Sequence, residues 1–230
     1  MKKASLILFL LIAFDCITYA QNVTIGTQVW ATKNLDVSVF RNGDPIPEVK
    51  TDAEWTAAGE NKQPAWCYFK NDSINYKKYG KLYNCWAIRD KRILAPEGYH
   101  IPSENEWRIL ISYLGGREIA GEKMKSQSGW NIYKQNAEYD RYGELIQSEK
   151  SISGNGTNIC GFSGHPFGIR SYNQIGDPFY GNNVSTEWWS STVASWTKNE
   201  ITFGLSNEGK YVDEGNNSIF GGLYIRCIKD

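Results

Sequence analysis

Residues 98–116 constrain the fold of this chain more than any other segment, because they carry a full set of helix signals. Ser103 and Glu106 form the S-x-x-E pattern of a capping box, in which each side chain binds the backbone N–H of the other residue. Large apolar residues then recur with the spacing of one helix face: Trp107, Leu110, Ile111 and Leu114. Gly115 and Gly116 can adopt the left-handed backbone that closes a helix. The segment predicts an amphipathic helix that packs on a sheet.

The N-terminal region predicts a hairpin and a short helix. Strand-forming residues at 23–30 are interrupted by Gly26, which supplies a turn. Thr51 and Glu54 repeat the capping-box pattern, so one or two helical turns are expected at 55–58.

The rest of the chain predicts a mixture of strands and helix. A strand is expected at 64–69, and the apolar spacing at 79–88 predicts a second amphipathic helix. Residues 117–164 are polar and predict a long surface excursion. The last strands are expected at 188–192, 200–205, 210–212 and 223–228. Helices followed by an antiparallel meander indicate an α+β fold.

The first twenty residues (1–20) have the features of a secretory signal peptide: two lysines, a mostly apolar run and a small residue at Ala20. The apolar run is too short to span a bilayer comfortably. Asp15 precedes Cys16, where a lipoprotein needs a small residue. We therefore expect cleavage after Ala20 and export to the periplasm, the outer-membrane surface or the medium, with 21–230 forming a single domain.

The expected mature chain is nearly neutral. It keeps 23 of the 25 basic and 24 of the 25 acidic residues. No basic block stands out, which argues against a nucleic-acid partner, whose phosphates must be neutralised. No second apolar run is present, so we expect no membrane span in the mature chain.

Four cysteines remain after the expected cleavage, and an even number in an exported chain favours two disulfides. The first hypothesis pairs Cys67 with Cys85 and Cys160 with Cys227. A Cys85–Cys227 bond is the alternative, and free thiols are the third possibility. No C-x-x-C spacing occurs, which argues against a thiolate zinc site.

Aromatic residues of the C-terminal half are the candidates for ligand contact. Trp188 and Trp189 are adjacent, so in a regular strand they face opposite sides and one of them is expected to be exposed. Trp196 lies in the following loop, and His165 lies in a glycine-rich loop. An exposed aromatic side chain beside Asn and Ser residues can stack on a sugar or anchor a protein partner. The alternative is that these rings fill the space between sheet and loop.

The sequence shows no catalytic constellation. Its two histidines exclude a histidine cluster for a metal, and His100 is expected to be a turn residue that binds the backbone. Glu106 is explained as a cap, and the neighbours Asp213 and Glu214 point to opposite faces of a strand. A G-x-S-x-G nucleophile motif is absent. We therefore favour a non-enzymatic protein.

Two segments rich in oxygen ligands suggest calcium as a possible cofactor. Their members are Asn182, Asn183 and Glu187 in one segment and Asp213, Glu214, Asn216 and Asn217 in the other. Solvated turns explain both segments better, so we expect neither a metal nor another cofactor.

Several motifs together resemble the Fibrobacter succinogenes major paralogous domain, a family of exported bacterial proteins. The matching segments span nearly all of the expected mature chain: 25–30 with Asn34 and Leu35, 42–47, 79–84, 98–107, 188–191 and 226–230. The family resembles the C-type-lectin-like and formylglycine-generating-enzyme-like folds. That resemblance implies two main helices flanking a twisted antiparallel sheet, long loop excursions and chain ends that lie close together.

The chain departs from the family pattern at one cysteine. The family usually has a cysteine just before the Pro-x-Gly-Tyr-His turn, where this chain has Leu94, Ala95 and Pro96. The usual partner of Cys227 is therefore missing, which leaves Cys85 or Cys160.

Three functional hypotheses follow. We favour a secreted or surface-associated binding module whose ligand is a glycan or a surface protein. The first alternative, implied by the resemblance, is an oxidoreductase with a redox-active cysteine, for which Cys160 and Cys227 are candidates. The second alternative is a structural or assembly component of the cell surface.

Overall fold

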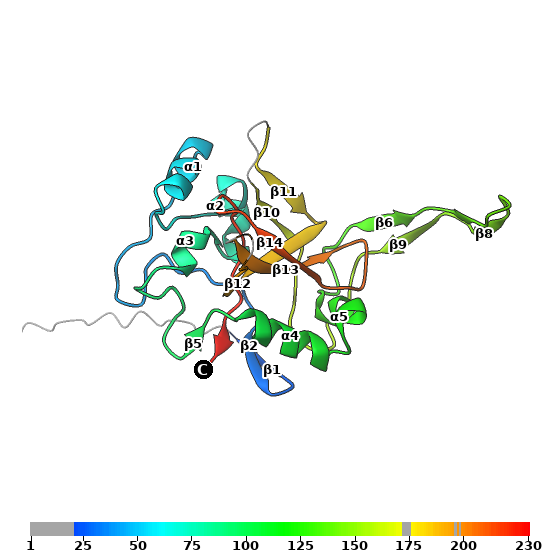
Figure 1. Ribbon diagram of the computed structural model, residues 1–230, viewed down its shortest axis with the longest axis horizontal. Helices are drawn as coiled ribbons and strands as arrows, with labels where there is room; N and C mark the ends of the chain where they lie inside the picture. Colours follow the sequence, from blue (N-terminus) through cyan, green and yellow to red (C-terminus); the bar gives the residue numbers. More distant parts are fainter. Residues whose placement is uncertain (1–20, 172–175, 196, 198) are drawn as a thin grey trace, which may run out of the picture.

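The computed structural model describes residues 21–171, 176–195, 197 and 199–230, so the expected signal peptide lies outside the described chain. The two ends of the described chain meet in one antiparallel sheet (Figure 1). β1 (Asn22–Ile25) and β2 (Gln28–Ala31) form the predicted hairpin, which turns at Gly26 with a φ of 63°. β2 pairs with β15 (Ile228–Lys229), which in turn pairs with β5 (Tyr99–His100).

A second antiparallel sheet, with the strand order β12-β13-β14, lies at the centre of the molecule. β12 (Ser185–Val193) and β13 (Glu200–Ser206) confirm the strands expected at 188–192 and 200–205. β14 (Asp213–Asn217) begins after the expected position at 210–212. The strand expected at 223–228 is reduced to isolated bridges at Leu223 and Tyr224 and the start of β15 at Ile228, because the backbone crosses between other strands instead of following one of them.

α4 (Glu104–Tyr113) packs on one face of this sheet and confirms the predicted helix. Ser103 Oγ accepts a hydrogen bond from the Glu106 N–H at 3.3 Å, and the Glu106 carboxylate accepts one from the Ser103 N–H at 2.8 Å. Trp107 is fully buried and stacks on Phe203 of β13, with ring centroids 5.1 Å apart. The two glycines after the helix have positive φ, as predicted.

The predicted helix at 79–88 is wrong. Gly80, with φ 87° and ψ −178°, separates the short 3-10 turn η2 (Lys77–Tyr79) from an extended segment. In that segment β4 (Leu82–Tyr83) pairs with β3 (Trp66–Cys67), and only α3 (Cys85–Ile88) is helical. Burial on both sides of β4 produces the apolar spacing that sequence analysis assigned to a helix.

The remaining short elements lie before β4. α1 (Asp52–Glu60) extends the predicted helical turns and begins with the expected capping box. The expected strand at 64–69 is reduced to β3, after which η1 (Phe69–Asn71) and α2 (Ser73–Tyr76) follow.

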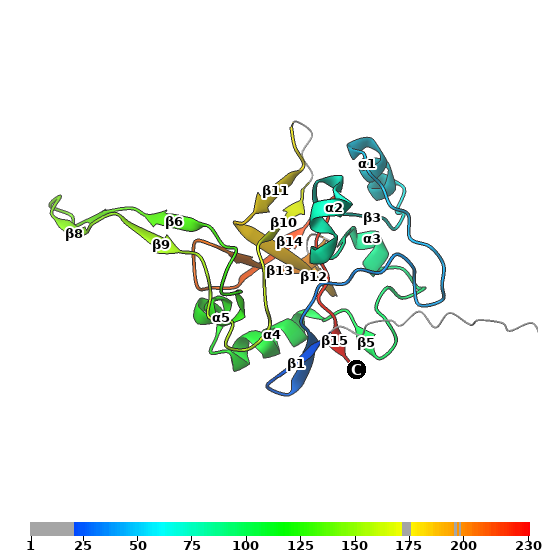
Figure 2. The ribbon, with the colours of Figure 1, turned by 180° about the vertical axis from the view of Figure 1, so that it is seen from behind.

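The segment expected to be a surface excursion contains a two-stranded arm. β6 (Ile132–Gln135) pairs with β9 (Lys150–Ser153), and β7 (Glu138–Tyr139) pairs with β8 (Leu145–Gln147). Figures 1 and 2 show this arm projecting far from the body of the molecule.

The flanks of that segment, however, belong to the body. α5 (Arg117–Met124) packs beside α4, and Phe162 is fully buried in the core. β10 (Phe167–Arg170) and β11 (Phe179–Asn182) then form a hairpin next to β12.

The buried apolar residues form two clusters, one on each side of β12. Trp188 belongs to the cluster beneath α4, and Trp189 belongs to the cluster that contains Tyr83 and Leu223. Mixed helices and antiparallel sheets confirm the predicted α+β class. Within the described residues, no helix has the length and apolar character needed to cross a membrane.

Candidate functional site

The face of the central sheet opposite α4 carries two carboxylates in one row. Glu187 of β12 lies beside Gly204 of β13, which lies beside Asp213 of β14. Residues in one row of a sheet project on the same side, so both carboxylates stand above Gly204. A Cβ atom placed on Gly204 would lie 3.2 Å from Glu187 Cγ and 3.5 Å from Asp213 Cβ. The missing side chain therefore leaves the space into which both acids lean.

Hydroxyl and amide groups from neighbouring rows lie on the same face of the sheet. Thr202 Oγ1 donates to Glu187 Oε1 at 3.4 Å, and Asn217 Nδ2 donates to Glu187 Oε2 at 3.1 Å. Tyr180 of β11 is 52% exposed and is close enough for the charge of Glu187 to raise the pKa of its phenol, together with burial as the larger cause. We call Tyr180, Glu187, Thr202, Asp213 and Asn217 the acidic sheet face.

Both carboxyl groups of this face ionise less readily than usual. Burial raises the pKa of Glu187, the hydrogen bonds from Asn217 and Thr202 oppose this rise, and the nearby Asp213 adds to it. Burial also raises the pKa of Asp213, against the opposing charge of Arg117. Two partly desolvated carboxylates beside a phenol and an amide can accept hydrogen bonds from a ligand rich in hydroxyl groups.

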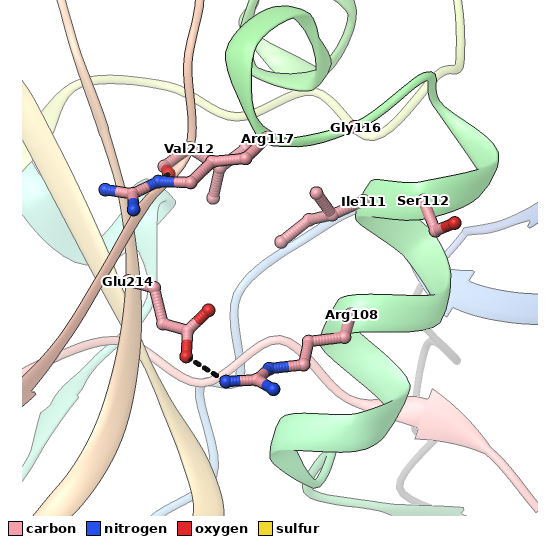
Figure 3. Close-up of a pocket in the computed structure, with 7 residues that line it drawn as sticks. All are labelled: Arg108, Ile111, Ser112, Gly116, Arg117, Val212 and Glu214. Carbon is pink, nitrogen blue, oxygen red and sulfur yellow. Dashed lines mark hydrogen bonds and ion pairs between the residues drawn. The ribbon is translucent and has the colours of Figure 1, made fainter.

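A small cavity lies on the other side of β14, between that strand, α4 and the start of α5 (Figure 3). Its volume is about 270 Å³, and Ile111 and Val212 are the apolar residues of its lining. Arg108 crosses the opening and forms ion pairs with Glu214 at 2.5 Å and Glu104 at 2.7 Å. The remaining lining residues are Ser112, Gly116 and Arg117. Asp213 and Glu214 thus serve opposite faces, as predicted.

A second, more open cavity of about 480 Å³ lies at the start of α1. Its charged lining residues are Lys50, Asp52, Lys70 and Asp177. Asp52 is paired with the buried Arg170, so part of this charge is already neutralised within the protein.

The predicted exposure of one of the two adjacent tryptophans is wrong. Trp188 is 1% exposed and Trp189 is 0% exposed, because each face of β12 is covered by one of the two clusters at this point. Trp188 Nε1 donates to Asn34 Oδ1 at 2.8 Å, and Trp189 Nε1 donates to the Tyr83 carbonyl at 2.7 Å. A surface ligand cannot stack on either ring.

The other two predicted contact residues have different outcomes. Trp196 lies outside the described residues. His165 is half-buried and stacks on Phe167, with ring centroids 5.1 Å apart. Burial lowers its pKa, and Arg226 lowers it further, so the ring is neutral at pH 7. His165 is not among the residues of the acidic sheet face.

His100 differs from its predicted role, because it binds two carboxylates instead of the backbone. Its Nε2 lies 2.7 Å from Glu106 Oε1, and its Nδ1 lies 2.7 Å from Asp230 Oδ1. Burial lowers the pKa of His100, but the two carboxylates outweigh this effect and raise it overall. The residue therefore links the start of α4 to the end of the chain.

Neither of the predicted disulfide arrangements is formed in this structure, where Cys67, Cys85, Cys160 and Cys227 are all free thiols. Cys67 and Cys85 lie in different clusters, and so do Cys160 and Cys227. The alternative partners Cys85 and Cys227 share a cluster but remain unbonded.

The environment of these thiols does not favour redox chemistry. Burial raises the pKa of Cys67, Cys85 and Cys227 to about 12 each, and it raises that of Cys160 as well. Reactive cysteines need a lowered pKa, because the thiolate is the nucleophile.

The structure brings together only some residues of the two oxygen-rich segments that suggested calcium. Glu187, Asp213 and Asn217 meet on the acidic sheet face, whereas Glu214 and Asn216 occupy the alternate positions of β14. Among the described residues, no three acidic, histidine or cysteine side chains are grouped in a way that could hold a metal ion.

Sequence analysis missed Tyr180 and Thr202, and it did not bring Glu187 together with Asp213. The available signal was the alternation Thr202-Phe203-Gly204, in which a small and a polar residue flank a large apolar one. That pattern marks a strand with one open face, but only the register of β13 with its two neighbours identifies the residues beside Gly204.

The geometry also explains several residues of the motifs on which the family resemblance rests. Asn34 Oδ1 accepts hydrogen bonds from Trp188 Nε1 at 2.8 Å and from Arg226 Nη2 at 2.9 Å. Arg226 is fully buried and donates to the Phe162 carbonyl at 2.6 Å. Residues from three separate motifs are thus joined inside the core, so these residues stabilise the fold.

Comparison with known proteins confirms the family resemblance. The family model of the Fibrobacter succinogenes major domain matches residues 23–229. No curated protein and no solved structure matches the chain. Because the match covers nearly the whole described chain, this protein belongs to the Fibrobacter succinogenes major domain family.

Proposed function

We propose that this protein is a non-enzymatic binding module that recognises a glycan through the acidic sheet face. The observation that carries the proposal is the row Glu187–Gly204–Asp213, where two carboxylates lean over a glycine that leaves room between them. Glycan hydroxyl groups are hydrogen-bond donors, and a partly desolvated carboxylate accepts from them more strongly than a neutral group does.

The neighbouring groups fit the same class of ligand. Asn217 offers an amide with both donor and acceptor capacity, and Tyr180 offers a half-exposed ring that can stack on the apolar face of a sugar. Sites of this kind combine a few well-placed polar groups with aromatic surface.

Three further parts of the proposal rest on the sequence. We propose that the chain is exported, that its α+β fold is C-type-lectin-like, and that binding needs no calcium. The meeting of the chain ends in one sheet and the position of the candidate site on the central sheet support the lectin-like arrangement. A surface protein is the alternative ligand, and a structural role is the alternative function.

A glycan array probed with the purified protein tests the proposal, once with calcium and once with a chelator. We expect the same set of glycans to bind in both conditions. Glu187→Gln and Asp213→Asn should each reduce that binding about tenfold, as loss of a charged hydrogen-bonding group does. Glu214→Gln is the matched control, because it removes a carboxylate from the opposite face of the same strand.

Two results would count against the proposal. An array without signal in both conditions would favour a protein ligand or an assembly role. Binding that is unchanged in the Glu187 and Asp213 variants but lost in Asp177→Asn would place the ligand in the open cavity at the start of α1.

A further inference from the structure

The tip of the two-stranded arm presents an unusual group of exposed apolar side chains. They are Tyr139, Tyr142, Leu145 and Ile146, each between 56% and 76% exposed, and we call them the arm tip. Large apolar groups that cluster on a projecting element indicate an interaction site, whereas single exposed ones need no explanation.

The turn that carries these side chains is closed by several hydrogen bonds. Asp140 Oδ1 accepts hydrogen bonds from the N–H groups of Tyr142 and Glu144, both at 2.8 Å. The Asp140 N–H donates to the Glu144 carbonyl at 2.8 Å, and Gly143 supplies the positive φ of 83° that the turn requires. A turn held in this way presents its apolar side chains in a fixed arrangement, which lowers the entropic cost of docking them.

The arm itself contributes little to the stability of the fold. Two-stranded ribbons are marginal in water, and their outer edges leave backbone groups unpaired. Figures 1 and 2 both show the arm extending away from the body, with α4 and α5 far from its end. The arm tip therefore does not reach an apolar surface of its own molecule.

The cavity between α4, α5 and β14 has the properties of a receptor for this tip. Its volume of about 270 Å³ lies below the range of about 300–1,000 Å³ that is typical of small-molecule sites, which favours an inserted side chain. Ile111 and Val212 supply apolar lining. Figure 3 shows Ile111 directed toward a space that the Arg108–Glu214 ion pair borders on one side, while the Arg117 side chain runs past Val212 on the other.

The charges of the two surfaces are complementary. Residues 138–147 contain three acidic residues and one basic residue, Arg141, which gives a net charge of −2. The cavity lining contains two arginines and one glutamate, a net charge of +1. Arg117 uses its Nε to bind the Val212 carbonyl at 3.0 Å and makes no ion pair within the described chain, so its outer guanidinium nitrogens can receive a carboxylate.

From these observations we infer that the arm tip of one molecule docks into the α4–α5–β14 cavity of a second copy of this chain, with Arg117 facing the acidic residues of the tip. Because the two surfaces differ, the contact is heterologous and joins molecules head to tail, so it can build rings or filaments. The near-neutral chain presents no net repulsion to such assembly.

Sedimentation velocity over a wide range of protein concentration tests this inference. The purified protein should show a sedimentation coefficient that rises with concentration. The double variant Leu145→Ser/Ile146→Ser should weaken association at least tenfold, because it removes central apolar anchors. Ile74→Ser is the matched control, since Ile74 is 93% exposed on α2 and belongs to neither surface, and it should associate like the wild type.

Two substitutions of residues that line the cavity test its role in the contact. Arg117→Glu should weaken association by a similar factor through charge reversal, and Ile111→Phe should do so by filling the cavity into which Ile111 points. Circular dichroism identifies any variant that fails to fold. If one cavity variant does not fold, the other still tests the inference.

A mixing experiment then distinguishes the head-to-tail contact from other forms of self-association. The tip variant retains its cavity and the cavity variant retains its tip, so the mixture should form a complex of two chains that grows no further. A wild-type protein that stays monomeric at all concentrations would overturn the inference. Association that both variants leave unchanged, or a mixture that forms no complex, would also overturn it.

Discussion

The two faces of the β12-β13-β14 sheet differ in chemistry although their residues alternate along the same strands. One face carries Trp188, Phe203 and Leu205, all buried beneath α4. The other face carries Glu187, Gly204 and Asp213, which α4 does not cover. The difference shows that this sheet divides two tasks between its faces: one supplies the core, and the other holds polar groups in a fixed arrangement.

The division is not complete along the whole second face. At the Trp189 end, the cluster that contains Tyr83 and Leu223 covers the sheet, and only the end near Glu187 remains open. Rigid strands position side chains more accurately than loops do, so a site on this open end needs little ordering when a ligand binds.

The largest effect should come from removing an anchor of the covered face. Phe203 is fully buried and stacks on Trp107, so Phe203→Ala leaves a cavity in the best-packed part of the core. We expect the free energy of unfolding to fall by about 3–5 kcal/mol. Urea denaturation followed by tryptophan fluorescence measures this change, and a loss below about 1 kcal/mol would mean that the two faces do not differ as described.

The next effect should separate binding from stability on the open face. Gly204→Val places a side chain in the space between Glu187 and Asp213, which must then move apart. We expect glycan binding to fall at least tenfold. Stability should change by no more than about 1 kcal/mol, because the higher strand propensity of valine offsets the crowding. Titration of an array-selected glycan, paired with urea denaturation, checks both values, and unchanged binding would contradict the proposed position of the ligand.

A smaller effect should appear as opposite pH trends in stability and in binding. Burial raises the pKa of Glu187 above its ordinary value of 4.5. At pH values between 4.5 and the raised pKa, the Glu187 carboxylate therefore takes up a proton when the protein folds. As the pH falls through this window, the wild type should become more stable relative to Glu187→Gln, while its glycan binding weakens because the carboxylate loses its charge. Denaturation and binding curves recorded at several pH values test this prediction, and parallel trends would refute it.

The smallest effect should be the reaction of the four cysteines with a thiol reagent in the native protein, which tests how well the core excludes the reagent. The raised pKa of each thiol keeps it protonated near neutral pH, and Cys67, Cys85 and Cys227 are also buried. We expect no fast reaction with a thiol reagent in the native protein and a full reaction of all four after denaturation. A thiol that reacts rapidly in the native state would restore the oxidoreductase hypothesis.

Features encoded by local sequence could be predicted, and features that depend on distant contacts could not. The cap at Ser103 and Glu106, the apolar stripe of α4 and the turn at Gly26 depend on residues a few positions apart, and all three are present in the structure. The segment 79–88 has an equally regular apolar pattern, but its pairing with β3 and burial on both sides turned part of it into a strand.

The candidate site illustrates the same limit. The alternation of β12 predicts that Trp188 and Trp189 face opposite sides, and they do, but it cannot reveal that both sides are covered there. Glu187 and Asp213 are 26 positions apart, and their meeting above Gly204 depends on the register of three strands. Sequence analysis therefore found β12 and β13, placed β14 too early and did not predict β11, and the tryptophans that it selected on β12 lie in the core.

The most direct test of the central claim is calorimetric titration of one array-selected glycan into three proteins. The wild type and Glu214→Gln should bind it with the same affinity, whereas Glu187→Gln/Asp213→Asn should bind at least tenfold more weakly with an unchanged urea midpoint. Equal affinity in all three proteins would show that the open face of the central sheet does not bind the ligand.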